Sequence, residues 1–434
     1  MNATASSSRA DLLTLGFGTA VAMWTVGWLG RMPGVALPGP ALAVGLVVVL
    51  AWGGFLCGRL TDRGWRGGAL AGAVAASLNL LIVLSALRGE GVAHLLSVPG
   101  TIVGTAALMA ASAALGARKP RRATDPEVWT GRFALVAAVA TALLLLAGGL
   151  VTGREAGLSV PDWPQSFGVN MFLYPLARMT GNIYYEHTHR LYGTLVGVTT
   201  VALWMHLQRT DGRRWVHMAA LAGVAAVVLQ GVMGGLRVAL AEAGPGVEVA
   251  EAAHETTLSS ALRVAHGVFG QAFFALMVLI AAATSRTFRR LQPFSASTAA
   301  VDRQLGPLLL GALLVQLLLG ALVRHLQLDV TLHISMGALV ALLACVAGLR
   351  AFGLYGKAVP ALARCGLVTM AVVGVQLALG VAALVGVSLS SRAQPTLLDA
   401  LATTAHQTNG ALLLGCAVWL TALTRRALRD AEAI

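Results

Sequence analysis

Long apolar runs recur along this chain, and most of them are close to twenty residues long. A helix of about 20 apolar residues crosses the ~30 Å hydrocarbon core of a bilayer. Only 11% of the 434 residues are charged, whereas soluble domains carry about 25%. We therefore expect an all-α polytopic membrane protein with about twelve transmembrane helices. Their approximate cores are residues 12–30, 39–58, 69–87, 95–117, 133–152, 190–207, 216–236, 264–284, 306–323, 333–351, 362–387 and 406–424.

The basic residues lie mainly in short segments between the apolar runs, and the formal net charge is +13. If the N-terminus is cytoplasmic, the inward-facing segments contain 22 of the 31 Lys and Arg residues. Cytoplasmic loops of membrane proteins carry such an excess, so we predict that both termini are cytoplasmic. The charge then reflects topology in the lipid bilayer, and we expect no nucleic-acid partner. We interpret the first run as a retained helix rather than a cleaved signal peptide.

Two basic linkers, at residues 117–132 and 285–303, divide the predicted helices into groups of four. We expect a leading accessory four-helix membrane block at residues 1–120. Two pseudo-repeated four-helix bundles should follow, the first at residues 121–290 and the second at residues 291–434.

A short motif supports the repeat. Q-x-x-x-G occurs near the end of three odd-numbered spans, and a fourth span has Leu144 in place of the glutamine. Small residues at this spacing let helices approach closely. Generic packing is an alternative, but the shared register favours a duplicated four-helix unit. The four segments are residues 143–152, 229–238, 315–324 and 375–384.

Four of the ten histidines occupy matching positions, each at the predicted outer start of an even-numbered span. A glycine follows each of them within four residues. Neutral imidazole is a good axial ligand for heme iron, and a four-helix bundle can point side chains from facing helices into a shared core. We therefore predict two bis-histidine heme sites, with the glycines letting a flat macrocycle approach the backbone. The residues are His189, His266, His333 and His406, followed by Gly193, Gly267, Gly337 and Gly410.

The stretch EHTHR at residues 186–190 has charged groups with two interpretations. Glu186 and Arg190 are spaced for an i,i+4 ion pair. Alternatively, Glu186 presents a carboxylate on the face of His189, beside a bound porphyrin. His187 competes with His189 as a ligand; residues two apart on a helix point to different sides, and we prefer His189 because its position matches the other three.

Four arginines, Arg154, Arg190, Arg263 and Arg324, lie near the same predicted outer ends. Arginine suits carboxylates such as heme propionates. Long basic side chains at an interface also extend to water without any ligand, and both interpretations stay open for each arginine.

Two segments carry a family resemblance. GGLVTGREAGLSVPDWPQSFG (residues 148–168), followed by GNIYYEHTHR (residues 181–190), resembles the first outer loop and second helix of heme A synthases. The resemblance covers roughly residues 129–430. Some bacterial members carry a cysteine pair in this loop, which is absent here, and the four leading helices are not part of the family core.

The resemblance implies an oxidoreductase of cytochrome oxidase assembly. It would oxidise a porphyrin methyl of heme O to the formyl group of heme A by successive hydroxylations. It also implies a heme O substrate site at His189 and His266, a heme b cofactor at His333 and His406, and a catalytic Glu186. The implied partners are a heme O synthase and an unknown redox partner. The implied location is the bacterial inner membrane, with the heme sites toward the outer face.

Two rival functions use the same features. A di-heme b-type electron-transfer protein, working with a quinone or another redox partner, needs the four histidines but not Glu186. A porphyrin or small-molecule transporter would suit the repeats. Transporters, however, have polar sites near the bilayer midplane, whereas the polar residues here crowd the predicted outer edge.

Overall fold

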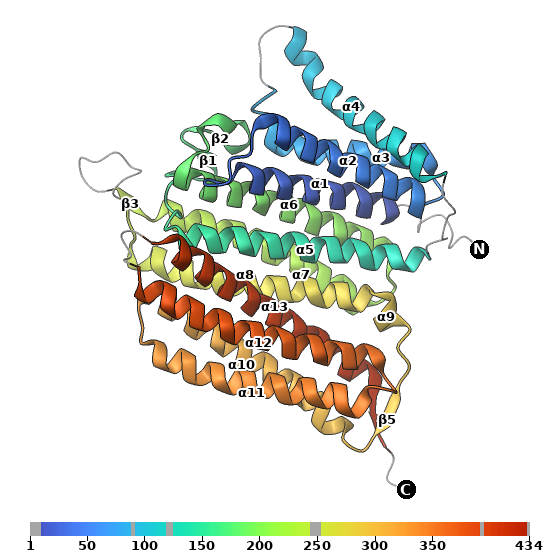
Figure 1. Cartoon of the computed structure of the whole chain (residues 1–434), viewed down its shortest axis with the longest axis vertical. Coiled ribbons are helices and arrows are strands. Elements are labelled where there is room, and N and C mark those ends of the chain that lie inside the picture. Colours follow the sequence, from blue (N-terminus) through green and yellow to red (C-terminus); the bar gives the residue numbers. More distant parts are fainter. Residues whose placement is uncertain (1–9, 88–91, 119–124, 244–252, 391–394, 432–434) are drawn as a thin grey trace. The chain divides into compact units, whose positions relative to one another are not determined.

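The computed structural model describes residues 10–87, 92–118, 125–243, 253–390 and 395–431. These residues include twelve helices of 20 to 31 residues (Figure 1). They are α1 (Ala10–Arg31), α2 (Gly39–Leu60), α3 (Gly64–Val83), α4 (Val92–Gly116), α5 (Pro126–Gly153), α6 (Gly181–Thr210), α7 (Arg214–Ala239), α8 (Thr257–Thr284), α10 (Ala299–Leu326), α11 (Val330–Tyr355), α12 (Pro360–Ser388) and α13 (Leu397–Ala427).

The other elements are short. Strands β1 and β2 pair antiparallel, β3 and β4 pair antiparallel, and β5 and β6 pair parallel. The elements are α9 (Arg286–Arg289), the 3-10 helices η2 (Met171–Leu173) and η3 (Leu176–Arg178), and the strands β1 (Gln165–Ser166), β2 (Val169–Asn170), β3 (Glu242–Ala243), β4 (Ala253–His254), β5 (Phe294–Ala296) and β6 (Leu428–Asp430).

The predicted all-α membrane fold is confirmed, and each predicted span coincides with one long helix. Ten of the twelve helices have the length and mean hydropathy of a membrane span. The other two, α6 and α13, are long enough, at 30 and 31 residues, but less apolar. The first of them carries the polar stretch EHTHR. The two polar helices are therefore the ones that hold His189 and His406.

Most of the site histidines lie deeper in their helices than the sequence suggested. His189 follows the first residue of α6 by eight residues, and His266 and His406 follow the starts of α8 and α13 by nine. Only His333, three residues into α11, lies in a first turn. The helices extend beyond their apolar cores because polar residues continue the helical hydrogen bonding at these ends, so hydropathy alone placed the starts too late.

The chain forms two compact units. The first unit comprises Met1–Leu144 and Ser159–Val224, and the second comprises Leu145–Leu158 and Ala225–Ile434. The boundaries between them fall within α5, in the loop that follows α5, and within α7. The predicted domain boundary near residue 120 lies outside the described residues, and the division into three domains stays a prediction.

In the first unit, α4 packs closely on α2 and α3 through glycine. A Cβ atom added at Gly58 of α2 would lie 1.8 Å from the backbone oxygen of Ala113, and one added at Gly68 of α3 would lie 2.5 Å from that of Met109. Any larger residue would force the helices apart, so these glycines set the helix spacing in the leading block.

The leading block also packs directly on α6. The Tyr184 hydroxyl donates a hydrogen bond to the carbonyl of Trp28 in α1, and the Tyr192 hydroxyl lies 2.9 Å from the Thr25 hydroxyl. The rings of Trp24 and Trp28 contact Tyr192 with centroids 5.7 and 6.0 Å apart. Both tyrosines are 2% exposed, so α1 covers one face of the helix that carries EHTHR.

In the second unit, α10, α11, α12 and α13 form a four-helix bundle (Figure 1). Each of α10 and α12 packs against both α11 and α13, and α8 packs against α10 and α13. The shared core consists mainly of alanine, leucine and valine, including the fully buried Leu309, Leu362 and Ala417. This arrangement brings the starts of α11 and α13 to the same end of the bundle.

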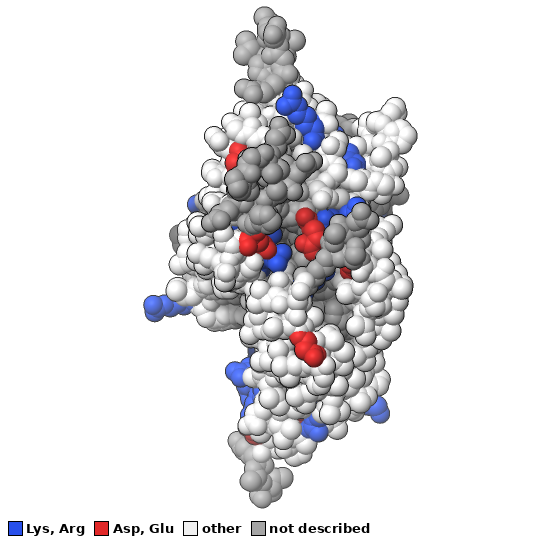
Figure 2. All heavy atoms as spheres, turned by 90° about the vertical axis from the view of Figure 1, so that its left-hand side faces the viewer, with Lys and Arg blue, Asp and Glu red and all other residues white. Residues whose placement is uncertain are grey.

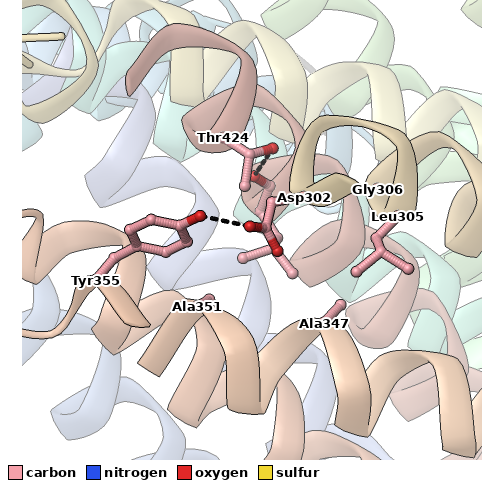
Figure 3. A pocket seen from close by; sticks show the side chains of 8 residues that line it. Asp302, Leu305, Gly306, Ala347, Ala351, Tyr355 and Thr424 are labelled. Atoms are coloured by element: carbon pink, nitrogen blue, oxygen red, sulfur yellow. Dashed lines mark hydrogen bonds between the residues drawn. The ribbon is translucent and has the colours of Figure 1, made fainter. Parts of the chain in front are cut away.

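At the opposite end of this bundle, a buried carboxylate links two helices. Asp302 of α10 accepts hydrogen bonds from Arg350 at 2.6 and 3.1 Å, from Thr298 at 3.0 Å and from the Tyr355 hydroxyl. Figure 3 shows Tyr355 pointing at Asp302 across a small pocket of mostly apolar side chains. Strands β5 and β6 pair beside it. Since Asp302 is 5% exposed, these donors fix α10 to α11 far from the histidines.

Candidate functional site

His333 of α11 and His406 of α13 face each other in the second unit. Their ring centroids lie 6.2 Å apart, and the ring planes are inclined at 76°. Both side chains are partly exposed. The structure therefore brings together the two histidines that the sequence assigned to one heme.

The helix start beside His333 is well defined. Asp329 caps α11, and its carboxylate accepts a 2.6 Å hydrogen bond from the Thr331 amide. Hydrogen bonds from the side chain and backbone of Thr331 lower the pKa of Asp329. A negative carboxylate also interacts favourably with the positive end of the helix dipole. Asp329 therefore stabilises the first turn of α11, which carries His333.

Each imidazole of the pair packs against a glycine of the preceding helix. A Cβ atom added at Gly320 of α10 would lie 3.0 Å from Cε1 of His333, and one at Gly380 of α12 would lie 3.2 Å from Cε1 of His406. The glycine of each Q-x-x-x-G segment thus makes room for a side chain rather than for a neighbouring helix backbone. This finding corrects the interpretation based on close helix approach.

The glutamines of the same segments contact the same histidines. Nε2 of Gln316 donates to the carbonyl of His333 at 3.0 Å and lies 3.1 and 3.4 Å from the two ring nitrogens. Nε2 of Gln376 lies 3.2 and 3.4 Å from the ring nitrogens of His406. Sequence reasoning noticed the glutamines but assigned them no contact with the site.

The same arrangement occurs once more, between α7 and α8. Gln230 donates to the carbonyl of His266 at 3.2 Å, and a Cβ atom at Gly234 would lie 3.2 Å from Cε1 of that histidine. On α8, the glycine that lies beside Gln230 is Gly270: a Cβ atom added there would lie 3.5 Å from Nε2 of Gln230. The sequence had indicated Gly267 instead. Three of the four predicted site histidines therefore share one local geometry.

His189 and His266 belong to different units, and their pairing stays a prediction. The surroundings of His189 are described within the first unit. It lies on α6, one turn beyond Glu186 and Tyr185, and is partly exposed.

Glu186 is a buried carboxylate with donors on both oxygens. Oε1 accepts from Arg190 at 2.5 Å, and Oε2 accepts from the backbone amide of Val160 at 2.8 Å. Its exposed fraction is 4%. The predicted i,i+4 ion pair is therefore present.

Arg190 fastens the outer loop to α6. Its terminal nitrogens donate to the carbonyls of Asp162 at 2.6 Å, Gln165 at 3.1 Å and Val160 at 2.9 Å, in addition to Glu186. These four bonds use both terminal nitrogens fully, because each carries two N–H groups. A propionate could reach them only if Arg190 released the loop.

The loop has its own internal order. The carboxylate of Asp162 accepts 2.7 Å hydrogen bonds from the amides of Phe167 and Gly168, which close the turn between β1 and β2. Gly168 has a φ of +74°, which favours glycine at this turn. The Trp163–Pro164 peptide is cis. The segment SVPDWPQSFG is thus a structured cap on the start of α6.

His187 lies beneath this loop. It is 1% exposed, its Nδ1 lies 3.1 Å from the Ser166 hydroxyl, and its ring packs 5.1 Å from that of Tyr174. Its contacts are with the loop, which supports the choice of His189 over His187 as a ligand.

Two of the predicted arginines of the second unit, Arg263 and Arg324, form ion pairs with acidic residues. Glu255 accepts from Arg237 at 2.9 Å and from Arg263 at 3.0 Å. Arg324 donates to the carbonyl of Thr152 at 3.0 Å. Figure 2 shows acidic and basic atoms side by side on a face that is otherwise mostly uncharged. Arg237 and Glu255 were missed by sequence reasoning; their position at helix ends near His266 was the available signal.

The facing pair has the chemistry and spacing for a heme iron. Imidazole–metal bonds are about 2 Å long. Two such bonds, added to the distance from each ring centroid to its ligating nitrogen, give a centroid separation close to the observed 6.2 Å. The two glycines admit the rings without displacing the helices. His333 and His406 therefore fit an axial ligand pair.

Together, these features define a multi-pass membrane protein with a facing imidazole pair in one unit and a loop-capped carboxylate in the other. Comparison with known proteins narrows this class. Residues 131–332 match the COX15-CtaA family, described as cytochrome oxidase assembly protein. The heme A synthase of Roseobacter denitrificans is 30% identical over 220 residues, which cover 44% of this chain and 55% of that protein.

The match confirms the resemblance to heme A synthases for this stretch of the chain. The chain spans about half the length of this curated relative. The family match includes Glu186, His189 and His266 and ends just before His333.

Proposed function

We propose that the protein is a membrane heme A synthase. Its reaction would oxidise a porphyrin methyl of heme O to the formyl group of heme A by successive hydroxylations. Glu186, His189 and His266 would serve the substrate, and His333 and His406 would hold a heme b. The proposed location is a bacterial inner membrane, with both termini in the cytoplasm and the heme sites toward the outer face. A heme O synthase and a redox partner are the proposed protein contacts.

The observation that carries this proposal is the buried Glu186 within the segment that matches the family. A rival electron-transfer protein needs ligand histidines but has no use for a carboxylate held in this way. The facing pair of His333 and His406 supports a second, permanent heme, although it lies outside the matched residues.

Glu186 has a defined part in the proposed chemistry. The N–H groups of Arg190 and Val160 stabilise its negative charge and fix its orientation. The carboxylate can accept a proton during methyl oxidation or stabilise positive charge that develops on the substrate. The loop above it limits access of water to this carboxylate.

The histidines would supply orientation. Heme b, when bound, contributes one-electron redox chemistry, which the protein tunes through the ligands and their surroundings. The imidazoles of His333 and His406 fit into the space that Gly320 and Gly380 leave on the neighbouring helices. His189 and His266 would orient the porphyrin of the substrate so that one methyl meets Glu186.

The proposal is tested by expressing the full chain beside a heme O source and separating the extracted porphyrins by chromatography. The unmutated protein should produce heme A. Glu186→Gln keeps the size of the side chain but not its charge, and it should accumulate heme O or a hydroxylated intermediate. Glu127→Gln, an exposed position in the first turn of α5, is the control and should behave like the unmutated protein.

Two results would contradict the proposal in different ways. Ordinary heme A yields from Glu186→Gln would reduce that residue to an ion-pair partner of Arg190. Bound b-type heme without any heme A from the unmutated protein, where a known heme A synthase works, would favour the di-heme electron-transfer function.

A further inference from the structure

We infer that Gln316 and Gln376 are positioning residues that hold the imidazoles of His333 and His406 in place. The inference rests on the proposed heme b site between these histidines. It assigns a role to two side chains that are not themselves ligands; Gln316 lies within the family match and Gln376 lies beyond it.

The first support is a reciprocal fit between neighbouring helices. Residues four apart lie on the same face of a helix, so each glutamine stands one turn from the glycine that receives the imidazole. The helix that carries the histidine has, in turn, a glycine that makes room for the glutamine. A Cβ atom at Gly337 would lie 3.2 Å from Nε2 of Gln316, and one at Gly410 would lie 3.3 Å from Nε2 of Gln376.

This fit corrects the predicted role of the second glycine. Gly337 and Gly410 were expected to let a macrocycle approach the backbone, but they admit a glutamine amide instead. Each helix pair therefore contains one glutamine, one histidine and two glycines, and each glycine makes space for the long side chain of the other helix. The pair formed by α7 and α8 repeats the pattern, which makes a chance contact an insufficient explanation.

The second support is the cost of a glutamine in an apolar helix. A buried N–H group without a hydrogen bond costs free energy, so the Nε2 end of Gln316 needs an acceptor. For Gln316 the partner is the carbonyl of His333 at 3.0 Å, and the same Nε2 touches both ring nitrogens. An imidazole with iron on one nitrogen and a proton on the other offers no acceptor to this NH2 group. The amide therefore restrains the ring by van der Waals contact, while its hydrogen bond to the carbonyl holds the helix turn.

The third support is a difference between the two glutamines. Oε1 of Gln376 accepts from Nδ2 of Asn409 at 2.8 Å, and that Nδ2 also donates to the carbonyl of Val372 at 3.0 Å. Oε1 of Gln316 has no hydrogen-bond partner within the described residues. Asn409 thus holds Gln376 in turn through its side-chain amide.

The consequence for the heme follows from the behaviour of ligand-supporting groups. Substituting a partner of a metal-ligating histidine typically costs about 10–100-fold in metal affinity. It also changes the electronic properties of the centre. Loss of either glutamine should therefore leave the ligand in place but weaken its hold and alter its ring orientation.

The test uses the full chain purified with its heme, and it compares Gln316→Leu and Gln376→Leu with the unmutated protein. Heme loss to excess apomyoglobin should be about 10–100-fold faster in both variants. The electron paramagnetic resonance g values, which report the relative orientation of the two imidazole planes, should shift. Gln304→Leu, at an exposed position earlier in α10, is the matched control and should show neither change.

Asn409→Leu separates positioning from general damage to the bundle. It should shift the g values in the same direction as Gln376→Leu, by a smaller amount. If the glutamine variants cannot be purified, this variant still tests the positioning role. Unchanged heme loss and unchanged g values in the variants would overturn the inference alone. An unmutated protein that binds no b-type heme would instead refute the proposed site, and the inference with it.

Discussion

The strongest quantitative prediction concerns Arg190, which joins the outer loop to α6. Arg190→Gln removes the ion pair with Glu186 and three hydrogen bonds to loop carbonyls. The arginine and glutamate side chains are only 10% and 6% exposed, so solvent screens the pair weakly. Removing one partner of a buried pair costs about 3–5 kcal/mol, because the other charge is left uncompensated.

This free-energy cost should lower the stability of the closed loop relative to a locally opened state. At about 1.4 kcal/mol per tenfold change, the opening equilibrium should rise by roughly two to four orders of magnitude. The amides of Val160, Phe167 and Gly168 report it directly, since each donates to a carboxylate of this network. Hydrogen–deuterium exchange with mass spectrometry on the protein in nanodiscs should show these amides exchanging faster by that factor.

Two further variants sharpen the result. Arg190→Lys keeps the charge but lacks the planar fork of donors, so its exchange rates should lie between those of the unmutated protein and Arg190→Gln. Arg178→Gln, an exposed arginine of the same loop, should leave them unchanged. Exchange at unmutated rates in Arg190→Gln would show that the loop is held by other contacts, and the reasoning from the ion pair would be wrong.

Two other predictions address ligation and topology. His333→Ala and His406→Ala should each abolish a low-spin b-type absorption spectrum while His325→Ala preserves it; retention of the spectrum in both of the first two variants would refute the ligand assignment. In a variant without native cysteines, Ser159→Cys should react with a membrane-impermeant thiol reagent in intact cells and Thr210→Cys should not, and the opposite labelling would invert the predicted orientation.

The fold was largely predictable because hydropathy marks membrane helices directly. Each apolar run corresponds to one helix. What hydropathy could not provide was the extent of the polar ends. Helix α6 begins at Gly181, well before its apolar core, because backbone hydrogen bonding continues through residues that a hydropathy window excludes.

The site was predictable in its residue types but not in its contacts. Equivalent positions in a repeat identified His333 and His406, and the structure brings them together. The partners Gln316 and Gln376 were visible in the same sequence as a motif. Their contact with the histidines depends on which helices are neighbours and how they are rotated, and neither property can be read from one segment alone.

The outer loop shows a second limit of sequence reasoning. The i,i+4 spacing correctly predicted the pair of Glu186 and Arg190. It could not predict that Val160 would supply the second donor or that Arg190 would bind three carbonyls. These contacts join residues some 25 to 30 positions apart, and only the folded loop brings them together.

The packing of α1 against α6 has a consequence for how the chain enters the membrane. The helix that carries EHTHR falls short of the hydropathy of a membrane span, and charged residues raise the cost of insertion, by about 2.5–3.5 kcal/mol each at a helix centre and less near its ends. During synthesis α1 leaves the ribosome first, and it offers Thr25 and the carbonyl of Trp28 to the two tyrosines of α6. We expect the early helices to assist the insertion of α6. This helix, the least apolar of its unit, would then pack against α1 on entering the membrane instead of facing lipid alone.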